Sequence, residues 1–392
     1  MKSGMRNLPE LNLINFCRAL SIFIVLAQHA NNRNHVLTVP NVEFIHLFYG
    51  RFTSNGFYGV CLFFVLSGFL ITRLIAELPG SLYQPDFKDF YIRRTGRIIP
   101  LLTAVTLVGV LISFLGTPHT PQMDTCFKNG NSHYSLGFWL SICFFIFNWF
   151  SIFHPFDAPV LALNWGVLWS LSIEEQFYLF YPLALKFLRT EKALLRFLVF
   201  VIVSGPIYRW VAFRATQGDG AMVLHGSFGC FDQIAIGALL YLLSRIYGPF
   251  LNRKKMLAAA FCASGFAGMV FVFFSTNPSW GGQGGVQMIL GPSAMAFGLF
   301  FFLLGGLHLK FFETFSFFKG TSFVGRSSYG MYLWHGTVLF FLMPILDGHD
   351  IFLGFGIFFG MTVLVSWVSK RYFEEPVNRW WRRRWISENN LF

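Results

Sequence analysis

Long apolar runs separated by short polar segments dominate the chain. A helix that crosses the hydrocarbon core of a bilayer needs about 20 predominantly apolar residues, and eleven runs approach or reach that length. They cover residues 13–31, 56–77, 98–116, 136–153, 165–187, 194–213, 225–244, 256–275, 290–309, 328–346 and 352–371. This pattern predicts an all-α fold, a polytopic bundle of transmembrane helices.

Basic residues gather on alternate polar segments between these runs. With the N-terminus in the cytoplasm, 24 of the 30 basic residues fall on the cytoplasmic side, as the positive-inside rule requires. The basic segments fall on the cytoplasmic side along the whole chain only if one of the eleven runs does not span the membrane. The predicted exception is 136–153, which contains Asn148 and is followed by His154 and Pro155. We therefore predict about ten spans, a re-entrant or interfacial segment at 136–153, and both termini in the cytoplasm.

The composition agrees with a membrane protein. Charged residues make up 12% of the 392 residues and hydrophobic residues 55%, whereas soluble domains carry about 25% charged residues. This balance excludes a large soluble domain. The net charge of +12 would suggest nucleic acid in a soluble protein, but sorting of the basic residues across a bilayer explains it, so we expect no nucleic-acid partner. We predict one transmembrane domain over 1–376 and a basic cytoplasmic tail over 377–392.

Arg18 and His29 lie in the first apolar run, although a charged side chain at the membrane centre costs about 2.5–3.5 kcal/mol on insertion scales. They are eleven positions apart, close to three helical turns, so they share a face, ~16 Å apart along the axis. Histidine exchanges a proton near neutral pH and can act as a general base or a nucleophile. The structural alternative is a hydrogen-bonded helix-end histidine, with Arg18 extended to the lipid headgroups.

Three arginines cluster where the third run enters the membrane, at Arg93, Arg94 and Arg97. Arg94 and Arg97 share a helical face because they are three positions apart. A guanidinium group binds phosphate through two parallel N–H bonds, so these residues are candidates for binding a phosphorylated cofactor. The structural alternative is an ordinary positive-inside cluster or a contact with anionic lipid.

Two adjacent carboxylates, Glu174 and Glu175, stand near the start of an apolar run on the predicted external side. Ser170, Glu174 and Tyr178 recur at four-residue intervals and share a helical face. A carboxylate here can orient or deprotonate a polar group, or pair with an internal arginine. The structural alternative, an acid that favours the helix dipole, explains one glutamate better than two. Glu374, by contrast, flanks a later span and is interpreted as a boundary residue.

Another polar face lies in the run at 328–346. Ser328, Tyr332 and His335 fall on one helical face, and a histidine in the middle of this run indicates a polar interior. A structural hydrogen bond to another helix is the alternative to a role in catalysis. No cysteine or histidine cluster has the spacing of a metal site, so no metal is expected.

These blocks, taken in order, resemble the acyltransferase 3 family of multipass membrane enzymes, which O-acylate lipopolysaccharide, other envelope glycans, nodulation factors and some antibiotics. Arg18 with His29 matches the family's R-x10-H, and Arg94 with Arg97 matches its R-x-x-R. The other blocks that resemble family signatures are Gly56–Ile71, Trp169–Tyr178, Tyr329–His335 and Glu374–Pro376. The resemblance runs from Leu13 to about Pro376. Cys61 is a departure, because the family often has Asp there.

The resemblance implies a membrane O-acyltransferase, here an O-acetyltransferase, in the bacterial inner (plasma) membrane. The donor would be acetyl-CoA or another acyl-CoA in the cytoplasm, and the acceptor a hydroxyl of an extracytoplasmic glycan or glycolipid. His29 would act as base or as acyl carrier, which the sequence does not decide. The other implied site residues are Arg18, Glu174 and Glu175 for catalysis, Arg93, Arg94 and Arg97 for the donor, and Trp169, Ser170, Tyr178, Tyr332 and His335 for the acceptor.

A transporter or flippase of a glycan or small molecule is the alternative from another functional class. Transporters also place charged residues at helix interfaces inside the membrane. The absence of a visible internal repeat and the position of Arg94 and Arg97 at the cytoplasmic edge favour the enzyme.

Overall fold

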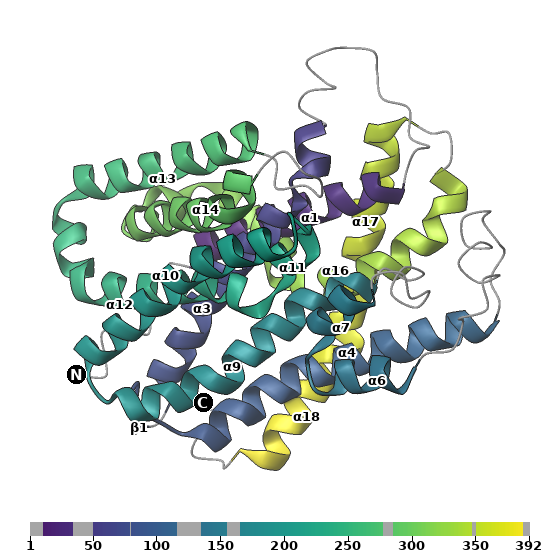
Figure 1. Cartoon of the computed structure of the whole chain (residues 1–392), viewed down its shortest axis with the longest axis horizontal. Helices are drawn as coiled ribbons and strands as arrows, with labels where there is room; N and C mark the ends of the chain where they lie inside the picture. The colour runs from purple at the N-terminus through teal and green to yellow at the C-terminus, as the bar shows by residue number, and fades with distance from the viewer. Residues whose placement is uncertain are drawn as a thin grey trace. The chain divides into compact units, whose positions relative to one another are not determined.

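The computed structural model describes residues 11–33, 50–78, 80–115, 135–154, 165–276, 285–346 and 350–386. Within these residues the fold is helical apart from one antiparallel pair of two-residue strands, β1 (Gly80–Ser81) and β2 (Gln84–Pro85). The prediction of an all-α fold is confirmed. The chain forms two compact units, which are described separately below (Figure 1).

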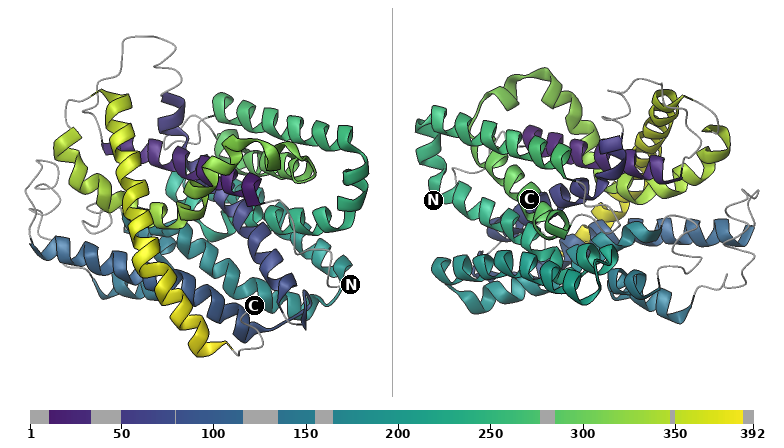
Figure 2. Two further views of the ribbon diagram at one scale, coloured as in Figure 1. Left: turned by 180° about the vertical axis from the view of Figure 1, so that it is seen from behind. Right: turned by 45° about the horizontal axis from the view of Figure 1, so that its top comes forward.

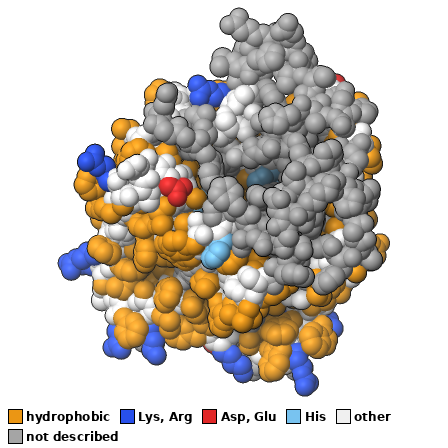
Figure 3. All heavy atoms as spheres, turned by 45° about the vertical axis from the view of Figure 1, so that its right-hand side comes forward, with side chains coloured by type: hydrophobic (Ala, Val, Ile, Leu, Met, Phe, Trp, Pro, Cys, Tyr) orange, Lys and Arg blue, Asp and Glu red, His pale blue; other side chains and the backbone are white. Residues whose placement is uncertain are grey.

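Eight of the described helices are long and apolar enough to cross a membrane. Two more, α9 (Leu168–Leu188, 21 residues) and α16 (Ser316–Leu346, 31 residues), have the length, but the predicted site residues make them more polar. These helices make the chain a multi-pass membrane protein, and the number of about ten spans stays a prediction. Hydrophobic side chains cover most of the described surface visible in Figure 3, where acidic side chains are rare.

Unit 1 contains Met1–Gln28, Phe48–Arg73 and Glu191–Ser328. It includes most of α1 (Leu11–Arg33), most of α3 (Gly56–Glu77) and the first part of α16. Its other helices are α10 (Glu191–Ala215), α11 (Gly220–His225), η2 (Ser227–Gly229), α12 (Phe231–Arg253), α13 (Lys255–Ser275), α14 (Gly285–Gly306) and α15 (Phe311–Thr314). In Figure 1, α13 and α14 lie side by side over most of their length.

Two glycines allow α3 and α12 of unit 1 to touch backbone to backbone. A Cβ atom added to Gly68 would collide with the Ile234 carbonyl, and one added to Gly237 would collide with the Val65 carbonyl. Small residues at such contacts let membrane helices gain van der Waals packing, which replaces the hydrophobic driving force that is missing in lipid. The glycine pair therefore fixes these two helices against each other.

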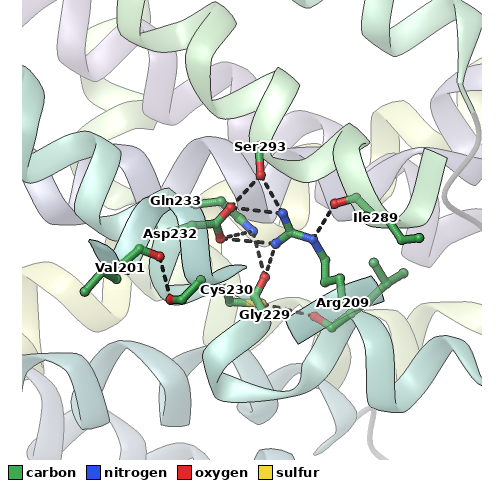
Figure 4. A network of polar contacts seen from close by, with 10 residues as sticks. Val201, Arg209, Gly229, Cys230, Asp232, Gln233, Ile289 and Ser293 are labelled. Atoms are coloured by element: carbon green, nitrogen blue, oxygen red, sulfur yellow. Dashed lines mark hydrogen bonds and ion pairs between the residues drawn. The ribbon is translucent and has the colours of Figure 1, made fainter. Parts of the chain in front are cut away.

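A buried ion pair joins α10, α12 and α14 of unit 1 (Figure 4). Arg209 and Asp232 have fully buried side chains and are linked by two hydrogen bonds, of 3.1 and 3.0 Å. Arg209 Nε also donates to the Ile289 carbonyl at 2.7 Å, and Ser293 Oγ donates to Asp232 Oδ2 at 2.6 Å. Cys61 of α3 is buried within electrostatic range of this pair. Because both charges are partnered, the network holds three helices together.

Helices α1 and α16 run parallel and in register within unit 1. Ser322 Oγ donates to Asn12 Oδ1 at 3.1 Å, and Arg18 Nε donates to Ser328 Oγ at 3.2 Å. Both pairs are separated by 310 positions in the chain. Between them, Gly325 lies directly against the Asn15 backbone. A constant separation in sequence means that both helices cross the membrane in the same direction.

Unit 2 contains His29–Leu47, Leu74–Thr190 and Tyr329–Phe392. Besides α9 and the ends of α1, α3 and α16, it includes α4 (Phe87–Leu115), α6 (Leu136–Cys143), α7 (Phe147–Phe153), η1 (Trp165–Val167), α17 (Ile351–Ser369), η3 (Lys370–Glu374) and α18 (Glu375–Trp385). Figure 2 shows that α17 continues through the π-helical η3 into α18. This helix of 35 residues is about 52 Å long, more than a bilayer core needs.

The run at 136–153 does not form one helix. It divides into α6 and α7, of 8 and 7 residues, and each is too short to span. Gln176 of α9 holds the turn between them, since its Nε2 donates to the Phe145 carbonyl at 2.7 Å and to Asn148 Oδ1 at 3.0 Å. This supports the prediction that 136–153 is the run that does not cross.

The directions of the helices also indicate that 136–153 does not cross the membrane. In unit 2, Tyr91 donates to the Leu179 carbonyl at 3.0 Å and Arg94 pairs with Glu175. Later residues of α4 thus meet earlier residues of α9, so the two helices are antiparallel. If 136–153 crossed the membrane, α4 and α9 would run in the same direction, and α1 and α16 would run in opposite directions.

Candidate active site

The predicted donor-binding arginines lie inside a helix rather than in a loop before it. Asp86 caps the start of α4, since its side chain accepts a hydrogen bond from the Asp89 amide at 3.0 Å. Asp89 in turn pairs with Arg93 at 3.2 Å. Helix α4 therefore begins at Phe87. Arg94 and Arg97 lie within it, so their spacing of three positions places them on one helical face.

Arg94 is surrounded by side chains of α9. Its Nη2 atom is 3.6 Å from Glu175 Oε1, and its Cζ atom lies 3.9 Å from the centre of the Tyr178 ring, a cation–π contact. Tyr178 donates to Glu174 Oε2 at 3.3 Å. The structure thus brings together Arg94, both predicted glutamates and Tyr178 in one cluster. Two of its atoms, Arg94 Nε and Glu175 Oε1, are buried without a hydrogen-bond partner among the described residues.

Arg97 is the more available of the two arginines. It is exposed, and the described part of the chain gives it no hydrogen bond or ion pair. Its electrostatic neighbours include Arg94, which repels it, and Glu174, which attracts it. The donors that remain for a phosphate group are therefore the guanidinium group of Arg97 and the Nε–H of Arg94.

Hydrogen bonds to α4 and α9 fix the next turns of α16. Tyr329 donates to the Ile98 carbonyl at 3.1 Å. Tyr332 lies 2.6 Å from Ser170 Oγ and donates to the Val167 carbonyl at 2.9 Å. The Val167 carbonyl also accepts from Ser170 Oγ at 3.3 Å, so both hydroxyl groups share this acceptor. Ser170 and Tyr332, both predicted acceptor-binding residues, are thus in contact.

His29 and His335 meet one turn further along α16. Their ring centres are 5.0 Å apart, with the planes at 45°; His335 is fully buried and His29 is half-buried. His335 Nδ1 lies 2.6 Å from the Tyr332 carbonyl oxygen, so this nitrogen carries the proton. In the neutral ring, Nε2 is then the nitrogen that carries the lone pair.

These contacts arrange unit 2 in levels. Arg94 and Arg97 come first, Ile98 with Tyr329 next, then Ser170 with Tyr332, and finally the two histidines. Four residues along α4 and six along α16 separate Arg94 from His335, a rise of about 15 Å. Polar contacts thus occur at each level between the guanidinium cluster and the imidazole pair, and we call this series of contacts the polar path.

Two other predicted residues have different surroundings. Arg18 is half-buried in unit 1 and donates to Ser328; its catalytic role stays a prediction. Trp169 is buried within α9, with 8% of its surface exposed, and its role toward an acceptor is likewise untested. Among the described residues, no group of three or more His, Cys, Asp and Glu is placed to hold a metal ion.

Glu374 joins the charge cluster, which the sequence did not indicate. Its Oε1 atom accepts a hydrogen bond from Ser369 at 3.1 Å and lies against Gly330, where an added Cβ would be 3.1 Å away. It interacts electrostatically with Arg97. Glu374 is the last residue of the π-helical η3, and π-bulges are frequent at functional sites. A glutamate next to a helix boundary gives no such signal in the sequence.

Sequence comparison gives an independent view of the chain. The family model described as an acyltransferase domain matches residues 11–371. The chain is 27% identical over 343 residues to the putative peptidoglycan O-acetyltransferase YrhL of Bacillus subtilis, covering 83% of this chain and 51% of that protein. It is 26% identical over 347 residues to the O-acetyltransferase OatA of Staphylococcus aureus (84% and 54%) and 27% identical over 381 residues to the peptidoglycan O-acetyltransferase OatA of Listeria monocytogenes (92% and 55%).

The chain thus spans about half the length of the relatives it matches. No solved structure is significantly similar to it. The family model covers nearly the whole chain, including the arginine cluster of α4, the paired glutamates of α9 and the two histidines. The chain therefore belongs to the acyltransferase 3 family.

Proposed function

We propose that the protein is a membrane O-acetyltransferase, which moves an acetyl group from cytoplasmic acetyl-CoA to a hydroxyl of an extracytoplasmic glycan. The observation that carries the proposal is the polar path in unit 2. It has two arginines at one end and two histidines at the other, about 15 Å away. A donor with anionic phosphates at one end and a reactive thioester at the other matches such a path. The names of the relatives, which describe them as O-acetyltransferases, support the reaction class.

Arg97 and Arg94 would bind phosphate groups of the donor. Their guanidinium groups can make charge-assisted hydrogen bonds to phosphate, and Arg97 is exposed enough to do so. The pairing of Arg94 with Glu175 and Tyr178 fixes the arginine in place before a donor arrives. Preorganisation of this kind lowers the entropic cost of binding.

The histidine pair would handle the proton of the acceptor hydroxyl. In direct transfer, the base nitrogen of His29 takes this proton while the hydroxyl oxygen attacks the thioester carbonyl; the C–S bond then breaks, and the sulfur leaves as a thiolate that takes the proton back. In two-step transfer, a neutral His29 nitrogen attacks the thioester first, the C–S bond breaks, and the leaving thiolate takes the remaining N–H proton of His29. The acceptor hydroxyl then attacks the acyl-imidazole, the C–N bond breaks, and the hydroxyl proton goes to the imidazole that leaves. In either route, Nε2 is the nitrogen of His335 that can accept a proton, because the Tyr332 carbonyl holds Nδ1–H.

We further propose that the protein lies in the bacterial inner membrane with both termini in the cytoplasm. The positive-inside distribution supports this orientation, and the parallel α1–α16 and antiparallel α4–α9 pairs agree with ten spans. The donor arginines then face the cytoplasm, where acyl-CoA is found. The acceptor would be an envelope glycan; two of the relatives carry peptidoglycan in their names.

The test uses purified full-length protein in detergent with radiolabelled acetyl-CoA and a panel of glycans. We expect saturable donor binding and transfer of label to at least one glycan. Absence of acetyl-CoA binding, together with glycan flux through the protein in sealed vesicles, would instead establish a transporter and overturn the proposal.

A further inference from the structure

Helix α18 is fastened to α4 beside the arginine cluster. Trp381 Nε1 donates to the Ile92 carbonyl at 3.1 Å. The Trp381 ring packs on Gly96, where an added Cβ would lie 2.5 Å from the indole Cδ1. Gly96 stands between Arg94 and Arg97 in the chain, so the C-terminal helix contacts the turn that carries the proposed donor site.

This contact brings two further arginines together. Arg93 follows Ile92 and Arg382 follows Trp381, the two residues that the hydrogen bond joins. The two arginines repel each other electrostatically. Asp89, paired with Arg93 at 3.2 Å, is the carboxylate that attracts Arg382. Arg382 Nε is buried without a hydrogen-bond partner in the described part of the chain. Two guanidinium groups thus lie within electrostatic range of one carboxylate, and Arg382 contributes an unused donor among the described residues.

The position of this pair relative to Arg97 limits which anion can occupy it. Arg93 lies one turn before Arg97 on α4, about 6 Å away along the axis. Ile98, and beyond it the histidine pair, lie on the other side of Arg97. An acyl-CoA has its thioester at one end, its diphosphate in the middle and its ribose 3′-phosphate near the other end. With the thioester at the histidines and the diphosphate at Arg97, the 3′-phosphate reaches the next turn outward.

We propose that Arg382, together with Arg93, binds the ribose 3′-phosphate of the acyl donor. This inference rests on the proposed acetyl-CoA-dependent function and adds a residue of α18 to its donor site. Helix α18 then has a specific task besides its contribution to the positive-inside charge. Arg383 and Arg384, which follow in the chain, are exposed and serve as comparisons.

The test measures the dissociation constants of acetyl-CoA and acetyl-dephospho-CoA, which lacks the 3′-phosphate. Full-length wild type, Arg382→Ala, Arg382→Lys and the control Arg383→Ala are compared in lipid-free detergent. We expect Arg382→Ala to weaken acetyl-CoA binding by about tenfold or more, the size of one charge-assisted contact, and to leave acetyl-dephospho-CoA unchanged. Arg382→Lys should restore part of the loss because it keeps the charge, and Arg383→Ala should bind both donors like wild type.

The remaining outcomes separate the two hypotheses. Equal weakening of both donors by Arg382→Ala, or no weakening of either, overturns the 3′-phosphate site while leaving the proposed function intact. An effect of Arg382→Ala that is seen only in nanodiscs with anionic lipid assigns the arginine to lipid headgroups and also overturns it. Failure of the wild type to bind either donor refutes the proposed function itself.

Discussion

Arg94 and Arg97 are three positions apart on α4, yet their surroundings differ. Arg94 is paired with Glu175 and stacked on Tyr178, whereas Arg97 is exposed. We therefore expect separable tasks for the two side chains: Arg94 mainly holds α4 to α9, and Arg97 mainly binds the donor phosphate of the proposed function.

Replacing Arg97 by Ala should weaken acetyl-CoA binding by about tenfold or more, because a hydrogen bond to a charged group contributes about 1.5–3 kcal/mol. The wild-type affinity should fall as salt is added, and that of the variant less steeply, since exposed charges are screened. Titration calorimetry at two ionic strengths measures both effects. Arg245→Ala, an exposed arginine of α12, is the control, and an Arg97→Ala affinity equal to that of this control contradicts the assignment.

The Arg209–Asp232 pair makes a prediction about stability alone. Arg209→Met leaves Asp232 buried without its counter-ion, and breaking a buried pair in this way costs about 3–5 kcal/mol. The double variant Arg209→Met, Asp232→Leu should recover most of the loss, because it removes both charges. The stabilities of the wild type, the single variant and the double variant are compared by unfolding them in a denaturing detergent and following gel mobility or fluorescence. A double variant as unstable as the single one would show that the network does more than neutralise a charge.

At the scale of helices, apolar runs predict spans well and helix ends poorly. The run at 56–77 coincides with α3, Gly56–Glu77. The run at 98–116, however, misses the first turns of α4, which begins at Phe87. Those turns are polar and stand outside the apolar window, although Asp86 caps them as a helix. Hydropathy detects contact with lipid rather than helical backbone.

The same limit applies to the candidate site. Periodicity correctly placed Ser170, Glu174 and Tyr178 on one face of one helix. The pairing of Arg94 with Glu175, or of His29 with His335, depends on how different helices pack, which no periodicity encodes. The burial of Arg209 at a helix interface likewise depends on packing. Glu374 was also missed, since its hydrogen bond with Ser369 and its electrostatic interaction with Arg97 depend on the folded structure.

The backbone contact between α3 and α12 gives a prediction at this scale. Gly237→Leu should prevent the close approach and lower the stability markedly, because the new side chain would collide with the backbone at Val65. The same substitution at Gly268 of α13, where no atom lies within 4 Å of an added Cβ, should be tolerated. Thermal unfolding of the two variants in the same detergent makes the comparison. Equal loss of stability in both would show that the close contact is not what matters.

For the whole molecule, helix directions and charge distribution lead to one topology. Both termini should lie on the cytoplasmic side, and residues 117–135, most of which fall outside the described residues, on the opposite side. Reporter tags at these three places, probed in intact cells and in inverted vesicles, measure the sidedness. Termini on opposite faces would mean that an odd number of segments cross and that 136–153 spans after all.

In the proposed function, donor binding and acetyl transfer take place at opposite ends of the polar path in unit 2, so we expect mutations to separate them. The decisive measurement compares wild type and His29→Ala for acetyl-CoA affinity and for single-turnover transfer of label to the glycan acceptor. We expect the variant to insert, to bind acetyl-CoA within about twofold of wild type, and to transfer at least about a hundredfold more slowly, the usual contribution of a positioned base. Transfer by His29→Ala at the wild-type rate would contradict the proposed mechanism.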